Sequence, residues 1–114
     1  MSTPKDLYDK LKNLSTIGKK VKYREKGKMG KGKSKVIGEI VDEVSVIEKN
    51  GEYKHFIQKI KRLDGTTQYR ICYYTINNKK TRIQFGQFAA EIPKENIKEL
   101  LIKAVQKRDF LSKD

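Results

Sequence analysis

The sequence has few of the residues that build covalent cross-links or metal centres. It contains one cysteine, Cys72, one histidine, His55, two prolines and no tryptophan in 114 residues. A single cysteine excludes an intrachain disulfide and a multi-cysteine zinc site, and a single histidine argues against a histidine-based metal cluster. We therefore expect a reduced, cytoplasmic setting and no cofactor.

Long hydrophobic runs are also missing. Apolar residues make up 36% of the chain, and the longest unbroken run is only a few residues, far short of the about 20 needed to cross a bilayer. The first ten residues lack the apolar stretch of a cleaved secretory signal. Composition and length therefore predict one small soluble domain, residues 1–114, with a modest core and no membrane association.

Positive charge is abundant and unevenly distributed. The chain has 27 lysines and arginines against 14 acids, a formal charge of +13. Nine of these cations and one acid lie between Lys19 and Lys35, a net charge of +8 in 17 residues punctuated by glycine. Such a segment cannot bury enough apolar surface to offset its backbone entropy, so we expect a mobile Gly/Lys-rich loop at about residues 26–35. Its charge predicts an arm that binds a polyanion, and a solvated loop is the alternative.

Hydrophobic spacing and turn residues predict a helix, then strands, then a helix. Pro4 begins a short helix that ends at Gly18. Strands are predicted over residues 36–47, 53–63, 67–76 and 81–88. Pro93 begins a final amphipathic helix. Short turns make the sheet antiparallel, so the predicted class is α+β: four to five strands, a C-terminal helix packed on one face and a short N-terminal helix.

Alternation along each strand divides the side chains between the two faces of this sheet. We place an apolar set that includes Phe56, Tyr73 and Phe85 against the final helix. The open face then carries Lys59, Lys61, Arg70, Tyr74, Arg82 and Gln84. Cations follow phosphates and aromatic rings stack on unpaired bases, so this face predicts a site for single-stranded nucleic acid. An ordinary solvated polar face is the alternative.

Two short motifs resemble catalytic signatures. Residues 27–34, GKMGKGKS, match the phosphate-binding loop of nucleotide hydrolases, but no buried strand precedes them and no helix is predicted after them. Asp42 with Glu52 and Lys54 resembles a metal-nuclease signature, in which carboxylates hold a metal ion that activates water. Glu52 follows a turn instead of lying within a strand. We therefore expect no enzyme activity and keep a small metal-dependent nuclease as an alternative.

Residues from Tyr53 to about Lys107 resemble the strands-then-helix unit of the Whirly and positive-cofactor-four-like single-stranded-DNA-binding proteins. The resemblance is carried by HFIQKI at 55–60, YRI at 69–71, FGQF at 85–88 and the helix after Pro93. It implies a curved antiparallel sheet, a homodimer formed partly through the helix, and single strands bound along the sheet.

The chain is more distantly similar to single-stranded-DNA-binding proteins of some thermophilic archaea that lack the OB fold and use an aromatic cleft flanked by basic residues. The N-terminal helix and the basic loop depart from the Whirly-like unit. An SH3-like barrel that begins within residues 18–47 is a further alternative.

These observations predict a non-catalytic protein that binds nucleic acid, single-stranded DNA or RNA in preference to duplex. The predicted binding residues are Lys19, Lys20, Lys22, Arg24, Lys31, Lys33, Lys35, Lys59, Lys61, Arg70, Tyr74, Arg82 and Phe88. The cations attract and neutralise phosphates and the aromatics stack on bases. The alternative from another class is a protein-interaction or ribosome-associated module, in which the acidic stretch at 39–48 and the basic loop match a protein partner.

Overall fold

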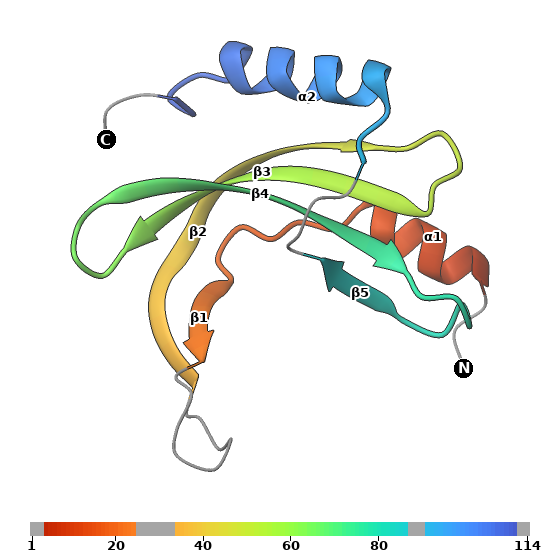
Figure 1. Ribbon diagram of the computed structural model, residues 1–114, viewed down its shortest axis with the longest axis horizontal. Coiled ribbons are helices and arrows are strands. Elements are labelled where there is room, and N and C mark those ends of the chain that lie inside the picture. The colour runs from red at the N-terminus through yellow and green to blue at the C-terminus, as the bar shows by residue number, and fades with distance from the viewer. Residues whose placement is uncertain (1–3, 25–33, 87–90, 112–114) are drawn as a thin grey trace.

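The chain forms one curved antiparallel sheet with a helix on each face (Figure 1). The computed structural model describes residues 4–24, 34–86 and 91–111. The elements in chain order are α1 (Pro4–Lys12), β1 (Lys20–Arg24), β2 (Ser34–Ile47), β3 (Tyr53–Arg62), β4 (Thr67–Ile76), β5 (Ile83–Gly86) and α2 (Lys94–Gln106). Each strand pairs with the next one along the chain, so β1 and β5 form the two edges of the sheet.

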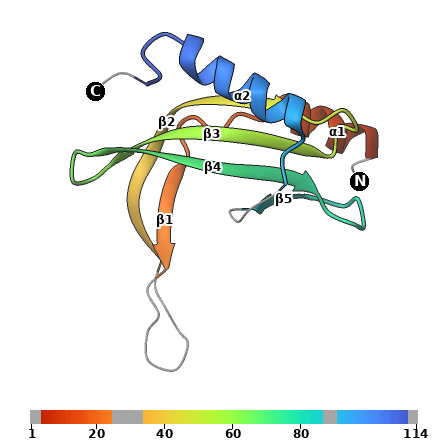
Figure 2. The ribbon, with the colours of Figure 1, turned by 45° about the horizontal axis from the view of Figure 1, so that its top comes forward.

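The curvature is concentrated in β2. Its pairing with β3 is interrupted between Ile40 and Asp42, and its pairing with β1 is interrupted at Val21. Such bulges bend a strand and increase its twist. Gly38 permits close approach at the bend, because a Cβ there would lie 2.7 Å from the carbonyl oxygen of Lys61. As a result β1 and the first half of β2 leave the plane of β3 and β4 (Figure 2).

The two helices cover opposite faces of the sheet. α2 packs Leu100 and Ala104 into a cluster that includes Ile57 of β3. α1 packs Leu11 into a cluster that includes Ile76 of β4. The β3–β4 register pairs odd-numbered residues with odd-numbered ones, so odd-numbered side chains of these two strands share one face, and even-numbered ones share the other. We call the face with the odd-numbered side chains the α2 face. The face with the even-numbered side chains is the concave face, since β1 and β5 bend away from α2 (Figure 2).

α2 also protects an unpaired stretch of β2. β1 pairs with β2 only as far as Glu39, and the backbone of Gly18 and Lys19 bonds to Ile40; beyond that residue no strand of the described chain pairs with this edge. The Lys103 ammonium donates to the Ser45 carbonyl at 2.9 Å, and Lys107 donates to the Glu43 carbonyl at 2.7 Å. Lysine side chains over an exposed edge oppose pairing with another chain.

The predicted α+β class is confirmed, and three of the predicted strands match β2, β3 and β4 within two residues. The N-terminal helix, α1, packs on the concave face, opposite α2. β1 was not predicted, since its lysines and arginine conceal the alternation of Val21 and Tyr23. In the described part of the chain the sheet stays open at β1 and β5, unlike the SH3-like alternative.

Neither helix of the described part of the chain has the length and apolar character needed to cross a membrane.

Candidate nucleic-acid interface

A row of three aromatic rings crosses the concave face from its centre to the β5 edge. The rings are Phe56 of β3, Tyr74 of β4 and Phe85 of β5. The Phe56 and Tyr74 centroids are 5.5 Å apart in edge-to-face geometry, and those of Tyr74 and Phe85 are 5.2 Å apart. Phe56 is fully buried, Tyr74 is half-buried and Phe85 is 45% exposed. The row therefore ends in an accessible ring that is held by buried neighbours.

Two cations lie over this row. The Arg70 guanidinium carbon is 5.1 Å from the centre of the Phe85 ring, and the Lys19 ammonium is 5.5 Å from the centre of the Tyr74 ring. Both distances are within the range of cation–π attraction. Lys19 comes from the segment that joins α1 to β1, whereas Arg70 comes from β4. Positive charge and an exposed ring thus meet at one place on the concave face.

A series of hydrogen bonds that runs from the surface into the interior fixes the position of Arg70. The Arg70 Nε donates to the side-chain oxygen of Gln58 at 2.9 Å, and the Gln58 amide donates to the Thr16 hydroxyl at 3.1 Å. The Thr16 hydroxyl and backbone N–H both donate to one carboxylate oxygen of Glu43, at 2.6 and 2.8 Å. Gln58 and Thr16 are completely buried. Networks of this kind hold side chains in a single arrangement.

Two titratable groups close to these hydrogen bonds, the Cys72 thiol and the Tyr74 phenol, remain neutral. Burial raises the pKa of Cys72 to about 11, although the nearby Arg70 opposes the shift. Burial likewise raises the pKa of Tyr74. At neutral pH the thiol and the phenol therefore stay protonated, so Cys72 is a packing group and not a nucleophile.

The prediction that Lys59 and Lys61 share an open face with Arg70 and Tyr74 is wrong. Lys59 pairs with Tyr69 and lies on the α2 face, as does Lys61. Lys59 is only 7% exposed and donates to the Asp109 carbonyl at 2.7 Å. The error arose from the register between strands, because Phe56 pairs with Cys72 and faces α1 instead of α2.

Of the other predicted residues, Arg70 and Tyr74 do share the concave face, and Lys19 joins them there. Tyr74 is packed between two rings, however, and is less open than expected. The residue that sequence reasoning missed is Phe85, because alternation assigns it to the side of the final helix, whereas it lies beside Tyr74 on the concave face. Its pairing with Tyr74 depends on the length of the β4–β5 turn, for which the sequence offers no direct signal.

The basic segment is described in part. Lys20 and Lys22 of β1 and Lys35 of β2 are exposed, and Lys20 forms an ion pair with Glu39. Arg24 lies in β1, and Arg82 is exposed just before β5. The predicted residues Lys31, Lys33 and Phe88 lie outside the described residues, as does the phosphate-loop match up to residue 33.

The residues of the nuclease-like motif are bonded elsewhere. The Asp42 carboxylate lies 2.6 Å from the Lys107 ammonium. Glu52 is bound by Lys80 at 2.7 Å, and the Lys54 ammonium donates to two carbonyls at the end of α1, each at 2.8 Å. Within residues 4–24, 34–86 and 91–111, no group of three histidine, cysteine or acidic side chains could hold a metal ion. The geometry therefore offers no support to the nuclease alternative.

Comparisons of the chain with protein-family models, curated proteins and solved structures gave no match. The candidate interface accordingly rests on the geometry of this chain alone.

Proposed function

We propose that the concave face binds single-stranded nucleic acid without catalysis. The observation that carries this proposal is the exposed Phe85 ring with the Arg70 guanidinium over it. An unpaired base stacks on the free side of Phe85, and Arg70 and Lys19 neutralise the adjoining phosphates. The bases of a duplex are already stacked on each other, so this ring favours single strands.

The exposed lysines of β1 and β2 extend the positive surface. Lys20, Lys22 and Lys35 are all solvent-exposed, and the whole chain carries a charge of +13. Each phosphate that such cations neutralise in a single strand contributes about 0.7 to the slope of log affinity against log salt. The proposal therefore requires affinity that falls steeply as salt is added.

The test is a fluorescence-anisotropy titration of a 20-nucleotide single strand, as DNA and as RNA, and of the matching duplex at two salt concentrations. Phe85→Ala should weaken single-strand binding by about 5- to 150-fold, because stacking on one ring is worth about 1–3 kcal/mol. Tyr53→Ala is the matched control, since Tyr53 is a partly exposed ring on the α2 face. Equal affinities for Phe85→Ala and the unmodified protein, with both folded, would refute the stacking role.

A protein-interaction module is the second candidate. The observation that favours it is the outer side of α2, where Leu101, Ile102 and Val105 are 51%, 43% and 74% exposed. Apolar side chains grouped on one surface are typical of protein contacts. The same titration separates the two candidates, because an adaptor of this kind has no salt-dependent affinity for a bare oligonucleotide.

A further inference from the structure

The turn between β4 and β5 contains a polar hollow that the concave face does not include. Its volume is about 500 Å³, and it is lined by Asn77, Asn78, Lys79, Thr81, Arg82 and Gln84. Gln84 pairs with Thr75, whereas the next residue, Phe85, pairs with Tyr74 on the concave face. The hollow and the exposed ring therefore lie on opposite sides of the same edge strand.

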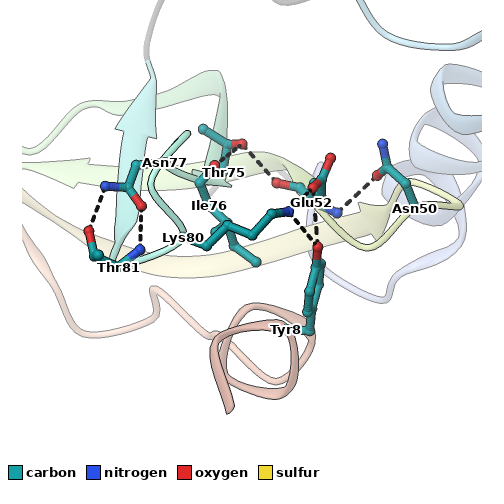
Figure 3. Close-up of polar contacts among 8 residues, drawn as sticks. All are labelled: Tyr8, Asn50, Glu52, Thr75, Ile76, Asn77, Lys80 and Thr81. Atoms are coloured by element: carbon teal, nitrogen blue, oxygen red, sulfur yellow. Dashed lines mark hydrogen bonds and ion pairs between the residues drawn. The ribbon is translucent and has the colours of Figure 1, made fainter. Parts of the chain in front are cut away.

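The turn is closed by its own hydrogen bonds. The Asn77 side-chain oxygen accepts from the backbone N–H groups of Thr81 and Arg82 at 2.7 and 3.0 Å. The Asn77 amide donates to the Thr81 hydroxyl at 2.8 Å (Figure 3). The backbone N–H of Asn77 also donates to the Arg82 carbonyl at 3.0 Å. The Asn77 and Thr81 side chains and the backbone of the turn are thus positioned before any ligand binds.

Lys80 anchors the turn to the rest of the protein. It has a positive φ of 54°, and its ammonium lies 2.7 Å from the Glu52 carboxylate and 3.0 Å from the Tyr8 hydroxyl (Figure 3). The hydrogen bond from Lys80 holds the pKa of Glu52 below its usual range, with a smaller contribution from Tyr8. The Lys80 ammonium is thereby directed away from the hollow, and its ion pair balances the negative charge of Glu52.

Lys79 and Arg82 are the cations that remain at the hollow. Both are exposed, and neither forms an ion pair with any residue of the described chain. No acidic residue lines the hollow. The lining thus combines two positive charges with amide and hydroxyl groups, which is the donor set that a phosphate group requires.

We infer that this hollow binds a phosphate monoester dianion, the terminal phosphate of a nucleic-acid strand. Two cations match its double charge, whereas an internal phosphodiester carries a single charge. Arg82 offers a planar pair of donors to two phosphate oxygens, Lys79 adds a point charge, and Gln84 supplies an amide N–H. β5 is at the edge of the sheet. A single-stranded nucleic acid whose base stacks on Phe85 can therefore pass round this edge and place its terminal phosphate in the hollow. The inference rests on the proposed function, because it takes the nucleic acid to be stacked on Phe85.

The test compares 12-nucleotide single strands of one sequence with a 5′-phosphate, a 3′-phosphate or hydroxyl groups at both ends. We expect one of the phosphorylated strands to bind about tenfold tighter than the hydroxyl-ended strand. In the double variant Lys79→Met/Arg82→Gln this gain should disappear, while binding of the hydroxyl-ended strand should weaken only as much as the loss of two positive charges weakens it in a control variant. The control Lys98→Met/Arg108→Gln removes the same charge from exposed positions on and after α2 and should keep the gain.

Three results would overturn the inference. One is equal affinity for all three strands. Another is a gain that the control abolishes as fully as the Lys79/Arg82 variant, since the gain would then report only net charge. The third is a shift of the Gln84 side-chain amide signals with inorganic phosphate but no gain for either phosphorylated strand, which would assign the hollow to a small free anion. Failure of the hydroxyl-ended strand to bind would instead refute the proposed function.

Discussion

The guanidinium of Arg70 lies over the ring of Phe85, 5.1 Å from its centre, although the two residues belong to different strands. One of the guanidinium N–H groups is used by Gln58. Arg70 is therefore oriented by the interior of the protein and presented at its surface, next to a ring that is 45% exposed. This relationship makes the concave face a candidate for binding and leads to the first prediction.

Gln58→Leu should destabilise the protein by about 1–3 kcal/mol, because the Thr16 hydroxyl loses the amide that donates to it and the Arg70 Nε loses its acceptor. It should also weaken single-strand binding, since Arg70 loses its orientation. Urea denaturation and anisotropy titration measure the two effects. Gln68→Leu, an exposed position on the same face, is the control and should stay within about 0.5 kcal/mol. Unchanged stability of Gln58→Leu would show that the hydrogen-bond chain contributes nothing.

Gly86 and Tyr73 should show strong non-additivity. A Cβ on Gly86 would lie 2.1 Å from the Tyr73 ring, which packs directly over this glycine. Gly86→Ala should therefore cost about 1–3 kcal/mol in the unmodified protein through overpacking. In a Tyr73→Ala background the same substitution should cost little, because the ring is gone. A double-mutant cycle by thermal or chemical unfolding measures the coupling. The same cost in both backgrounds would place the Tyr73 ring elsewhere.

Cys72 should make stability fall in alkaline solution. Its pKa rises from 9.0 when exposed to about 11 in the folded protein through burial. The folded state therefore holds the thiol proton more tightly, and this stabilisation is complete below pH 9 and lost as pH rises through about 11. The expected loss is roughly 1–3 kcal/mol. Unfolding at pH 8 and pH 10.5 should show a larger decrease for the unmodified protein than for Cys72→Ala. Rapid reaction of the native thiol with a disulfide reagent at pH 8 would contradict this prediction.

The outer side of α2 should mediate self-association. Leu101 and Val105 are exposed and one helical turn apart, so two copies can bury them against each other. Sedimentation equilibrium should give a homodimer at micromolar concentration, and Leu101→Glu/Val105→Glu should give a folded monomer. Lys94→Glu, an exposed change at the start of the helix, is the control. An unmodified protein that stays monomeric up to about 100 μM would contradict the predicted homodimer.

The elements of the fold were predictable because their signals are local. Gly51 and Gly65 adopt positive φ angles of 74° and 89°, a conformation that glycine permits, so the Asn–Gly and Asp–Gly pairs mark the β2–β3 and β3–β4 turns. Pro93 and the apolar spacing after it define α2. Alternation along β4 also assigns Tyr73 and Tyr74 to opposite faces. Each of these inferences needs only residues that are neighbours in the chain.

The composition of each face could not be predicted, because it depends on how strands are aligned with each other. A shift of one residue moves every side chain of a strand to the other face. The interruption at Val41 makes Ile40 and Val44, both even-numbered, pack in different clusters. The β3–β4 register puts Lys59 under α2 and Phe56 on the concave face.

The types of residue that meet at the candidate site were accordingly evident in the sequence, but their arrangement was not. Excess positive charge and interleaved aromatics are properties of the sequence, and they predicted a nucleic-acid partner. The alignment of Phe85 with Tyr74 and the path of Lys19 across the concave face are set by pairing and packing between distant segments. Those interactions form only when the whole sheet assembles, so the tertiary structure alone decided which cation meets which ring.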